Sequence, residues 1–208
     1  MESKGLTFRE LSEAEYIAFA KDHGSSPEIG AIATYFDAKT KKQANADVHL
    51  YGLFGCGTVC AAACCVVVQH ATIDTRVCKL DSIIVDSALR NHGLGKVIVS
   101  KILGSVLGAP QYRISSIFSH AVHPATVRIL SKLSFSDPPP VGAPLISVHL
   151  DEARRDQFLA KCQRVADSDI NNLKLQCLLC QQGSPKARRW CRPADQPAGK
   201  KAVAAVPR

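Results

Sequence analysis

Hydrophobic and polar positions divide the first part of the chain into a short strand and two helical stretches. Apolar and polar residues alternate from Leu6 to Leu11, as in a strand with one buried face. Ser12 stands three residues before Glu15, which is the spacing of a capping box, so we expect a helix that ends at Gly24. A further helix-compatible stretch runs from Glu28 to Ala38.

The next apolar runs predict a β-hairpin and a third strand. Val48–Phe54 and Thr58–His70 flank the turn sequence Gly55-Cys56-Gly57, which is a strong hairpin signal. The second run is apolar at nearly every position, as expected for a strand that is covered on both faces. Val77–Val85 alternates more clearly and ends at Asp86, and we interpret it as a third strand.

Helical and strand patterns alternate through the following segments. Val97, Ile98, Ile102 and Val106 recur at helical spacing, and Gly108 stops that helix. The order strand, helices, hairpin, strand, helix, strand, helix, strand predicts an α/β domain with a mixed sheet. The expected elements are a helix at Lys96–Leu107, a strand at Tyr112–Ser119, a helix at Ala125–Leu133, a strand at Leu145–Leu150 and a helix at Glu152–Ala166.

The positive charge of the chain is concentrated near its C-terminus. The 208 residues carry a formal charge of +8, but residues 184–208 alone hold seven Lys or Arg and one Asp, a balance of +6. The other 183 residues are close to neutral, with 19 basic and 17 acidic side chains. Pro, Ala and basic residues without a hydrophobic period predict a disordered tail, which suits a solubilising extension. Weak contact with nucleic acid or an acidic partner is the alternative role of this tail.

The sequence has neither a membrane-spanning run nor an export signal. Its longest apolar run, Val59–Val68, is about half the length that a bilayer-spanning helix needs. The first ten residues, MESKGLTFRE, are charged and lack the apolar stretch of a secretory signal. Nine cysteines without an export signal are typical of reduced thiols. We therefore expect a cytoplasmic protein that does not bind a membrane.

The segment Arg90–Lys96 (RNHGLGK) carries the clearest signal for a ligand. Gly93 and Gly95, between a strand and an amphipathic helix, allow the backbone to curl and present its N–H groups. The first helical turn adds N–H donors and the positive end of the helix dipole, so the segment suits phosphate oxygens. The opening glycine of G-x-x-x-x-G-K-[ST] and of G-x-G-x-x-G is absent, which disfavours mononucleotide and dinucleotide sites. An ordinary tight turn is the alternative interpretation.

Two ordered motifs give the chain a resemblance to a known family. LDSIIVDSALRNHGLGKVIVSKIL resembles the acetyl-CoA signature of the GNAT acyltransferase superfamily, an Arg/Gln-x-x-Gly-x-Gly/Ala turn. HPATVRILSKLSF resembles a later helix of that superfamily. The resemblance covers roughly residues 5–150 and implies a GNAT-like fold with splayed central strands. The matching positions are Arg90, Gly93 and Gly95 in the first motif, and Ile129, Lys132 and Phe135 in the second, with His123 at the usual Asn position.

The resemblance implies an enzyme that transfers an acetyl or longer acyl group from acetyl-CoA directly to an amine, without a metal. The backbone of residues 90–96 would bind the CoA pyrophosphate, and the strand at 83–85 would pair with the pantetheine arm. The domain would span residues 1–150, followed by a helical extension at 151–183 and the basic tail at 184–208. The implied binding residues are Ile83, Ile84, Val85, Arg90, Asn91, His92, Gly93, Leu94, Gly95 and Lys96.

The resemblance also points to three catalytic residues beside the expected gap between the central strands. Asp81 stands where family members often carry an acidic residue, which makes it the candidate base. Its alternative role is an ion pair with Lys79 or Lys101. His120 and His123 are candidate proton carriers, or else polar residues at a strand end.

The tyrosine that often serves as the general acid in this family is replaced here. The matching position is Leu130, which cannot protonate a departing thiolate, and Ser131 is a poor substitute. Three explanations stay open. The thiolate leaves without an acid; or His120, His123 or Tyr112 supplies the proton; or the protein binds an acyl-CoA without efficient turnover.

Cysteine spacing and the basic tail leave a second class of function open. Cys177 and Cys180 have the spacing of metal ligands, with Cys191 further on, but no second pair follows, so we expect reduced thiols. Cysteines in the predicted hairpin are expected to act as small hydrophobic side chains. The alternative function is a catalytically weak acyl-CoA-binding or nucleic-acid-associated module. A homodimer is compatible with either function, and the amine acceptor can be a small molecule or a protein.

Overall fold

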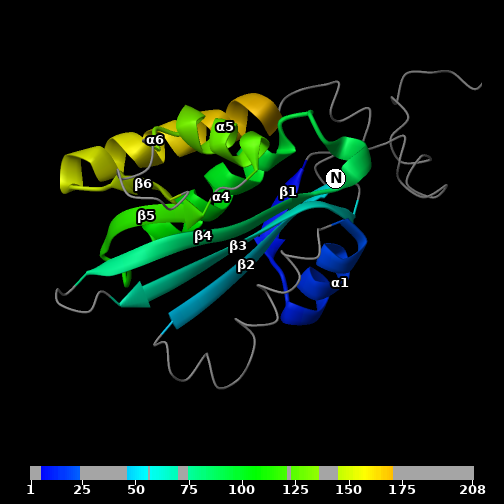
Figure 1. The fold of residues 1–208 in the computed structure, drawn as a ribbon, viewed down its shortest axis with the longest axis horizontal. Helices are drawn as coiled ribbons and strands as arrows, with labels where there is room; N and C mark the ends of the chain where they lie inside the picture. Colours follow the sequence, from blue (N-terminus) through cyan, green and yellow to red (C-terminus); the bar gives the residue numbers. More distant parts are fainter. Residues whose placement is uncertain are drawn as a thin grey trace, which may run out of the picture.

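Strands that are neighbours in the sequence are also neighbours in the sheet. The computed structural model describes residues 6–23, 46–55, 57–69, 75–120, 123–135 and 145–170. Within these residues six strands lie in the order β1-β2-β3-β4-β5-β6 (Figure 1). The elements are β1 (Thr7–Glu10), α1 (Glu13–His23), β2 (Ala46–Gly55), β3 (Thr58–Gln69), β4 (Arg76–Val85), the short 3-10 helix η1 (Ser87–Leu89), α4 (Leu94–Gly108), β5 (Ile114–His120), α5 (Pro124–Lys132), β6 (Leu145–His149) and α6 (Glu152–Ile170).

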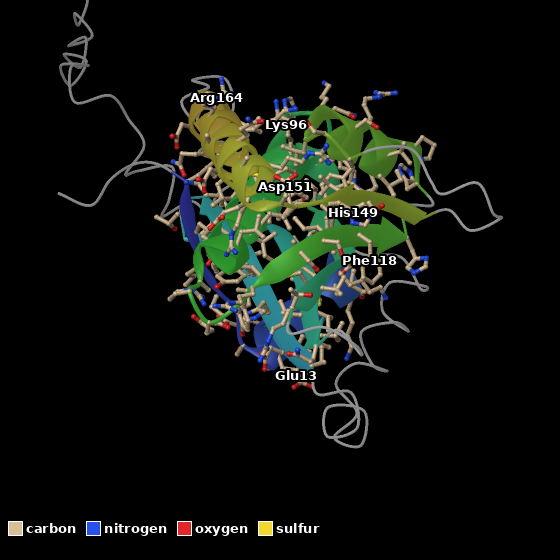
Figure 2. The ribbon with its side chains drawn as sticks, turned by 90° about the vertical axis from the view of Figure 1, so that its left-hand side faces the viewer. Glu13, Lys96, Phe118, His149, Asp151 and Arg164 are labelled. Atoms are coloured by element: carbon tan, nitrogen blue, oxygen red, sulfur yellow. The ribbon has the colours of Figure 1, made fainter. Side chains whose placement is uncertain are left out.

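Helices cover both faces of the sheet. α1 lies on one face and α4, α5 and α6 lie on the other (Figure 1). Figure 2 shows the same arrangement from the side, with Glu13 of α1 and Arg164 of α6 on opposite sides of the strands. Side chains of β3 alternate between two buried clusters. Ala63 and Cys65 belong to the cluster that includes α4, whereas Cys64 belongs to the cluster that includes α1. The prediction of a strand covered on both faces is confirmed.

β4 and β5 form the parallel pair of the described sheet, and α4 is the crossover between them. Their ladder is short, since it runs only from Arg76 opposite Ile114 to Lys79 opposite Phe118. Beyond Lys79 the two strands separate. The predicted fold class, a mixed α/β domain with splayed central strands, is therefore confirmed.

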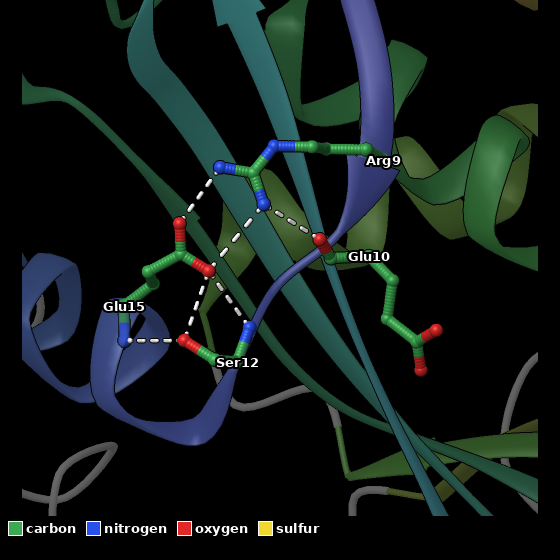
Figure 3. A network of polar contacts seen from close by, with 4 residues as sticks. All are labelled: Arg9, Glu10, Ser12 and Glu15. Carbon is green, nitrogen blue, oxygen red and sulfur yellow. Dashed lines mark hydrogen bonds and ion pairs between the residues drawn. The ribbon is translucent and has the colours of Figure 1, made fainter.

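α1 begins with the capping box that the sequence predicts. The Glu15 N–H donates to Ser12 Oγ at 3.3 Å, and the Ser12 N–H donates to Glu15 Oε2 at 2.9 Å. The Arg9 guanidinium, from β1, donates to both carboxylate oxygens of Glu15 (Figure 3). These hydrogen bonds, from Arg9 first and then from Ser12, lower the pKa of Glu15 to about 2. The network joins β1 to the start of α1.

The predicted elements match the observed ones to within a few residues. The hairpin forms between β2 and β3, with Gly57 at a positive φ of 81°. The helix predicted from Lys96 begins two residues earlier, and the last predicted helix continues to Ile170. The helix predicted at Glu28–Ala38, the residues Cys177, Cys180 and Cys191, and the tail at 184–208 lie outside the described residues.

α6 packs along α4 in the antiparallel direction. Arg155, near the start of α6, donates to the carbonyl of Leu107 at the end of α4, at 2.5 Å. Asp167, near the end of α6, lies 3.9 Å from Lys101 in the middle of α4. Phe158 is buried in the same cluster as α4. The expected boundary at residue 150, between the domain and its helical extension, stays a prediction.

None of the described helices is both long enough and apolar enough to cross a bilayer.

Candidate functional site

One extra residue in β4 changes which face of the sheet its side chains reach. β3 pairs with β4 through Cys64 opposite Ser82 and Cys65 opposite Leu80, so the register skips Asp81. This irregularity is a β-bulge. Leu80 belongs to the buried cluster around α4, whereas Ile84, beyond the bulge, belongs to the cluster around α1. Asp81 therefore stands at a kink in the central strand.

The bulge lies where β4 separates from β5. The last rung joins Lys79 and Phe118, and the next contact is made by a side chain, because the Ser119 hydroxyl donates to the Leu80 carbonyl at 2.8 Å. Beyond this bridge β4 continues to Val85 without a β5 partner in the described sheet. This part of β4 includes Ile83, Ile84 and Val85, and the Val85 carbonyl accepts a hydrogen bond from the Arg90 side chain.

β4 leads into a turn that is held in left-handed backbone conformations. Asp86 Oδ1 accepts the Ala88 N–H at 2.9 Å and caps η1. Asn91 and Gly93 follow with positive φ angles of 69° and 86°. Gly93 is the N-cap of α4, and its φ favours glycine over residues with a Cβ atom.

The start of α4 leaves backbone donors without a partner inside the helix. The Lys96 N–H already donates to the Gly93 carbonyl at 3.0 Å, so the N–H groups of Leu94 and Gly95 have no intrahelical acceptor. Together with the positive end of the helix dipole, these donors suit an anion. A Cβ at Gly95 would lie 3.0 Å from Ile129 Cδ1, so this end of α4 packs closely against α5.

Arg90 supports the turn through its side chain. Its guanidinium donates to the carbonyl of Val85 at 3.3 Å and to the carbonyl of His23 at 3.0 Å. These bonds fasten the turn to the end of β4 and to α1. Asn91 and His92 are exposed, and Lys96 is half-buried.

Asp81 is nearly buried beside one cation. Its side chain is 5% exposed, and its Oδ1 lies 2.7 Å from Lys79 Nζ. Its Oδ2 is buried and has no hydrogen-bond partner within the described residues. Of the two cations suggested by the sequence, Lys79 pairs with Asp81, whereas Lys101 lies near Asp167. An incoming N–H donor at Oδ2 would satisfy an acceptor that is costly to leave unpaired.

A pair of buried hydroxyl groups lies next to the bulge. Tyr16 Oη of α1 and Ser82 Oγ of β4 are 2.5 Å apart. Tyr16 is fully buried and Ser82 is 6% exposed. This pair was not predictable from the sequence, because 66 residues separate its members. Ser82, a polar residue directly before the apolar run Ile83–Val85, was the one local signal in the sequence.

His120 and His123 lie beyond the last rung that β5 shares with β4. His120 is exposed, and its ring contacts Phe118 edge-on at a centroid distance of 6.2 Å. His123 is the N-cap of α5, where its Nδ1 accepts the Ala125 N–H at 3.2 Å. In the described chain, no hydrogen bond or ion pair joins either histidine to Asp81.

Leu130 and Tyr112 are the two residues whose positions bear on the expected general acid. Leu130, at the place of that tyrosine, is fully buried in the core. The Tyr112 hydroxyl lies 3.1 Å from His49 Nε2, and the Arg76 guanidinium lies over the Tyr112 ring. Arg76 begins β4, whereas the glycine turn follows its end. Tyr112 therefore lies at the opposite end of the strand from the turn.

The cysteines of the sheet are buried thiols. Cys60, Cys64, Cys65 and Cys78 are free and buried. Burial raises the pKa of the Cys64 thiol well above its ordinary value. This environment agrees with the predicted role of small hydrophobic side chains. Among the described residues, no three His, Cys, Asp or Glu side chains gather where they could hold a metal ion.

Comparisons with known proteins give matches at the level of the fold. No family model and no curated protein matches the sequence. The solved structure of AtaTR bound with acetyl-CoA aligns with a TM-score of 0.56 at 14% identity, over 74% of this chain and 98% of that chain. AtaT complexed with acetyl-methionyl-tRNAfMet aligns with a TM-score of 0.52 at 14% identity, over 74% of this chain and 99% of that one.

A third solved structure comes from Desulfovibrio desulfuricans and is described as a proposed acetyltransferase of the GNAT family. It aligns with a TM-score of 0.50 at 12% identity, over 69% of this chain and 98% of that one. At these identities the likeness concerns the fold. The chain has a GNAT-like α/β fold, as its two motifs predict.

Proposed function

We propose that this protein transfers an acetyl group from acetyl-CoA directly to an amine. The observation that carries the proposal is the glycine turn at 90–96. It follows the strand that separates from β5, and it leads into α4, whose first N–H groups have no acceptor within the helix. The fold neighbours support the choice of donor, since AtaTR was solved with acetyl-CoA and AtaT with an acetylated methionyl-tRNA.

In this proposal the turn holds the pyrophosphate of CoA and β4 holds its pantetheine arm. The backbone N–H groups at the start of α4 donate to phosphate oxygens. The part of β4 at 83–85 has no β5 partner in the described sheet and can pair with the arm as with an added strand, apart from the Val85 carbonyl, which accepts from Arg90. Bound acetyl-CoA supplies an acetyl group activated as a thioester. The arm runs along β4 towards the bulge at Asp81.

In this proposal, side chains of the protein accept and transfer the protons. Asp81 Oδ2 accepts a proton from the ammonium form of the acyl acceptor, which leaves a neutral amine that can attack, while Lys79 holds Oδ1. The amide bond forms as the C–S bond breaks, and CoA leaves as the thiolate. His120 and His123 are proposed to carry protons between solvent and the gap where β4 and β5 stop pairing. Because Nδ1 of His123 accepts the Ala125 N–H, Nε2 is its atom left for that transfer. A thiol has an ordinary pKa near 8.5, so the thiolate can leave without the missing tyrosine.

One observation favours a second candidate function. Because Leu130 is fully buried, α5 offers no acid at the usual place, which suits a module that binds acyl-CoA with little turnover. In that case the basic residues at 184–208 would contact nucleic acid. Removing residues 184–208 separates the two candidates. If acetyl-CoA turnover persists while nucleic-acid binding disappears, the tail is an accessory to an enzyme.

Thermal unfolding with acetyl-CoA tests the proposed function directly. At a free concentration about 100 times its dissociation constant, a ligand stabilises the native state by about 2.7 kcal/mol. For a chain of this size each kcal/mol raises Tm by about 2–4 °C, so we expect a rise of about 5–10 °C. Thiol release in the presence of a panel of primary amines then measures turnover.

Substitutions in the turn show whether it is the binding site. Gly93→Asp and Gly95→Asp place a negative charge among the phosphate donors and should abolish the rise in Tm. Gly93→Asn is the matched control, because Asn and Asp both tolerate a positive φ but only Asp repels a phosphate. Gly104→Asp adds the same charge later in α4, where a Cβ meets nothing within 4 Å. An equal rise for the wild type and both turn variants would count against the site.

A further inference from the structure

A cavity of about 560 Å³ lies on the face of the sheet that α4 and α6 cover, where side chains of both helices and of the edge strand β1 line it. Its volume falls within the range of about 300–1,000 Å³ that is usual for small-molecule sites. Within the described part of the chain, none of residues 83–96 belongs to its lining. The cavity is therefore distinct from the glycine turn and from the β4 segment that precedes the turn.

The lining includes a buried hydroxyl group that lacks a partner. Ser100, in the middle of α4, is 1% exposed. Its Oγ is buried and makes no hydrogen bond to any described residue. A serine inside a helix often donates to a carbonyl of the preceding turn, and a buried hydroxyl that does not is costly. A ligand oxygen in the cavity could accept this hydrogen bond.

The cavity also carries one positive charge. Lys101 is the single charged side chain among the described residues that line it. Lys101 Nζ lies 3.9 Å from Asp167 Oδ1, which is longer than a hydrogen bond. The Gln163 side-chain amide donates to both oxygens of that carboxylate, at 2.9 and 2.8 Å. Asp167 is thus held by Gln163, and the Lys101 ammonium has donors left for a negatively charged ligand.

The remaining walls are mostly apolar. Phe8 and Leu159 are partly buried side chains that pack against the core, and Ala166 is 1% exposed. The Phe8 ring is fixed by stacking on Tyr51, with centroids 4.7 Å apart and ring planes 5° from parallel. A Cβ at Gly104, which also lines the cavity, would meet nothing within 4 Å. The space beside α4 is therefore unfilled and suits an apolar body.

We propose that this cavity binds a small aromatic monocarboxylate, at a site separate from the one proposed for CoA. The carboxylate accepts hydrogen bonds from the Ser100 hydroxyl and the Lys101 ammonium, and the second of these is charge-assisted. The aromatic body lies against Phe8 and Leu159 and fills the space beside Gly104. This combination of one cation, one unpaired hydroxyl and apolar walls matches one negative charge on an apolar molecule.

Calorimetric titration of the full chain with 4-phenylbutyrate and with 4-phenylbutanamide tests the charge preference. The two probes have the same shape, but only the first carries a charge. We expect the acid to bind at least about fivefold more tightly than the amide, as one partly exposed ion pair allows. Saturating acetyl-CoA should leave the dissociation constant of the acid unchanged.

Three substitutions assign the preference to named groups. Lys101→Met retains most of the side-chain stem and should reduce binding of the acid to the level of the amide. Asp167→Asn removes the carboxylate that competes for Lys101, so binding of the acid should tighten while binding of the amide stays the same. Ser100→Ala should weaken both probes, since each offers an oxygen to the hydroxyl.

A matched pair of glycine variants locates the site. Gly104→Leu places a side chain in the cavity and should abolish binding of both probes. Gly108→Leu is the control, because a Cβ there also meets nothing within 4 Å but Gly108 does not line the cavity. Both substitutions replace a helical glycine with a better helix former, so both variants should fold.

Four results would overturn the inference. The first is that neither probe binds to the wild type, and the second is that the acid and the amide bind equally well. The third is that Gly104→Leu binds the acid as the wild type does. The fourth is that saturating acetyl-CoA displaces the acid, which would place the acid in the site proposed for CoA. None of the first three results affects the proposed acetyl transfer, which depends on the glycine turn.

Discussion

At the scale of single residues, Asp81 shows how the backbone, burial and the proposed chemistry depend on one another. The β-bulge removes Asp81 from the register with β3, and the side chain is left nearly buried with one oxygen on Lys79. The other oxygen lacks a donor within the described residues, which costs about 1–3 kcal/mol for a buried acceptor. An ammonium group that donates to this oxygen recovers the cost. The proposed function therefore predicts an acyl acceptor that arrives as an ammonium group.

Replacement of Asp81 tests this role. Asp81→Asn preserves the shape of the side chain but cannot accept the proton, so turnover with amines should fall about 10²–10⁴-fold. Binding of acetyl-CoA should stay unchanged, because the glycine turn is not altered. Thiol release at saturating acetyl-CoA and calorimetry measure the two quantities. Asp47→Asn is the control, since Asp47 also pairs with a cation, Arg76, but at the other end of β4. A similar loss in both variants would rule out a specific role for Asp81.

At the scale of elements, the junction of β1 and α1 depends on a charge. Glu15 caps α1 and binds Arg9, and these contacts lower its pKa to about 2 from an ordinary value of 4.5. The unfolded chain therefore takes up a proton at this carboxylate before the folded chain does. The stabilisation is complete above about pH 4.5 and is lost as the pH falls towards 2.

Chemical denaturation between pH 2 and pH 7 checks this linkage. Glu15→Gln keeps the hydrogen-bonding shape of the capping box but removes the titrating charge. We expect lower stability than the wild type at pH 7 and a flatter decline of the free energy of unfolding below pH 4.5. Glu10→Gln is the control, because the Glu10 carboxylate points away from the network (Figure 3). Equal slopes for the wild type and Glu15→Gln would contradict the assignment.

Elements with local signals were predictable from the sequence. The spacing of Ser12 and Glu15 fixes the start of α1, because a capping box is formed by residues three apart. The apolar run of β3 is explained by burial on both faces. The helix after the turn begins two residues before its predicted start, because Gly93, in a left-handed conformation, caps it without a side chain.

The details of the site were not predictable, because they depend on contacts between distant segments. The bulge at Asp81 results from the pairing of β4 with β3, and the alternation within β4 alone does not reveal it. The same is true of the contact between Tyr16 and Ser82 and of the bridge from Ser119 to Leu80. The resemblance places Leu130 where the family often has a tyrosine, but it does not indicate which residue would act in place of that tyrosine.

At the scale of the whole molecule, α6 shares the core that supports the site. Phe158 is 5% exposed and lies edge-on to Phe135, with ring centroids 6.0 Å apart. Arg155 binds carbonyls at the end of α4 and after it, at Leu107 and Tyr112. α4 carries the glycine turn at its other end. The position of that turn therefore depends on a helix that the sequence motifs do not include.

Phe158→Ala tests whether α6 unfolds together with the rest of the domain. Loss of a buried aromatic side chain costs about 3–5 kcal/mol, so the free energy of unfolding should fall by that amount in one cooperative transition. Circular dichroism and amide hydrogen exchange should report the same midpoint. Arg154→Ala, at an exposed position of α6, should change stability by less than about 0.5 kcal/mol. If α6 instead loses protection in a separate, earlier step, it is an appendage, and residues 1–150 hold the site without its support.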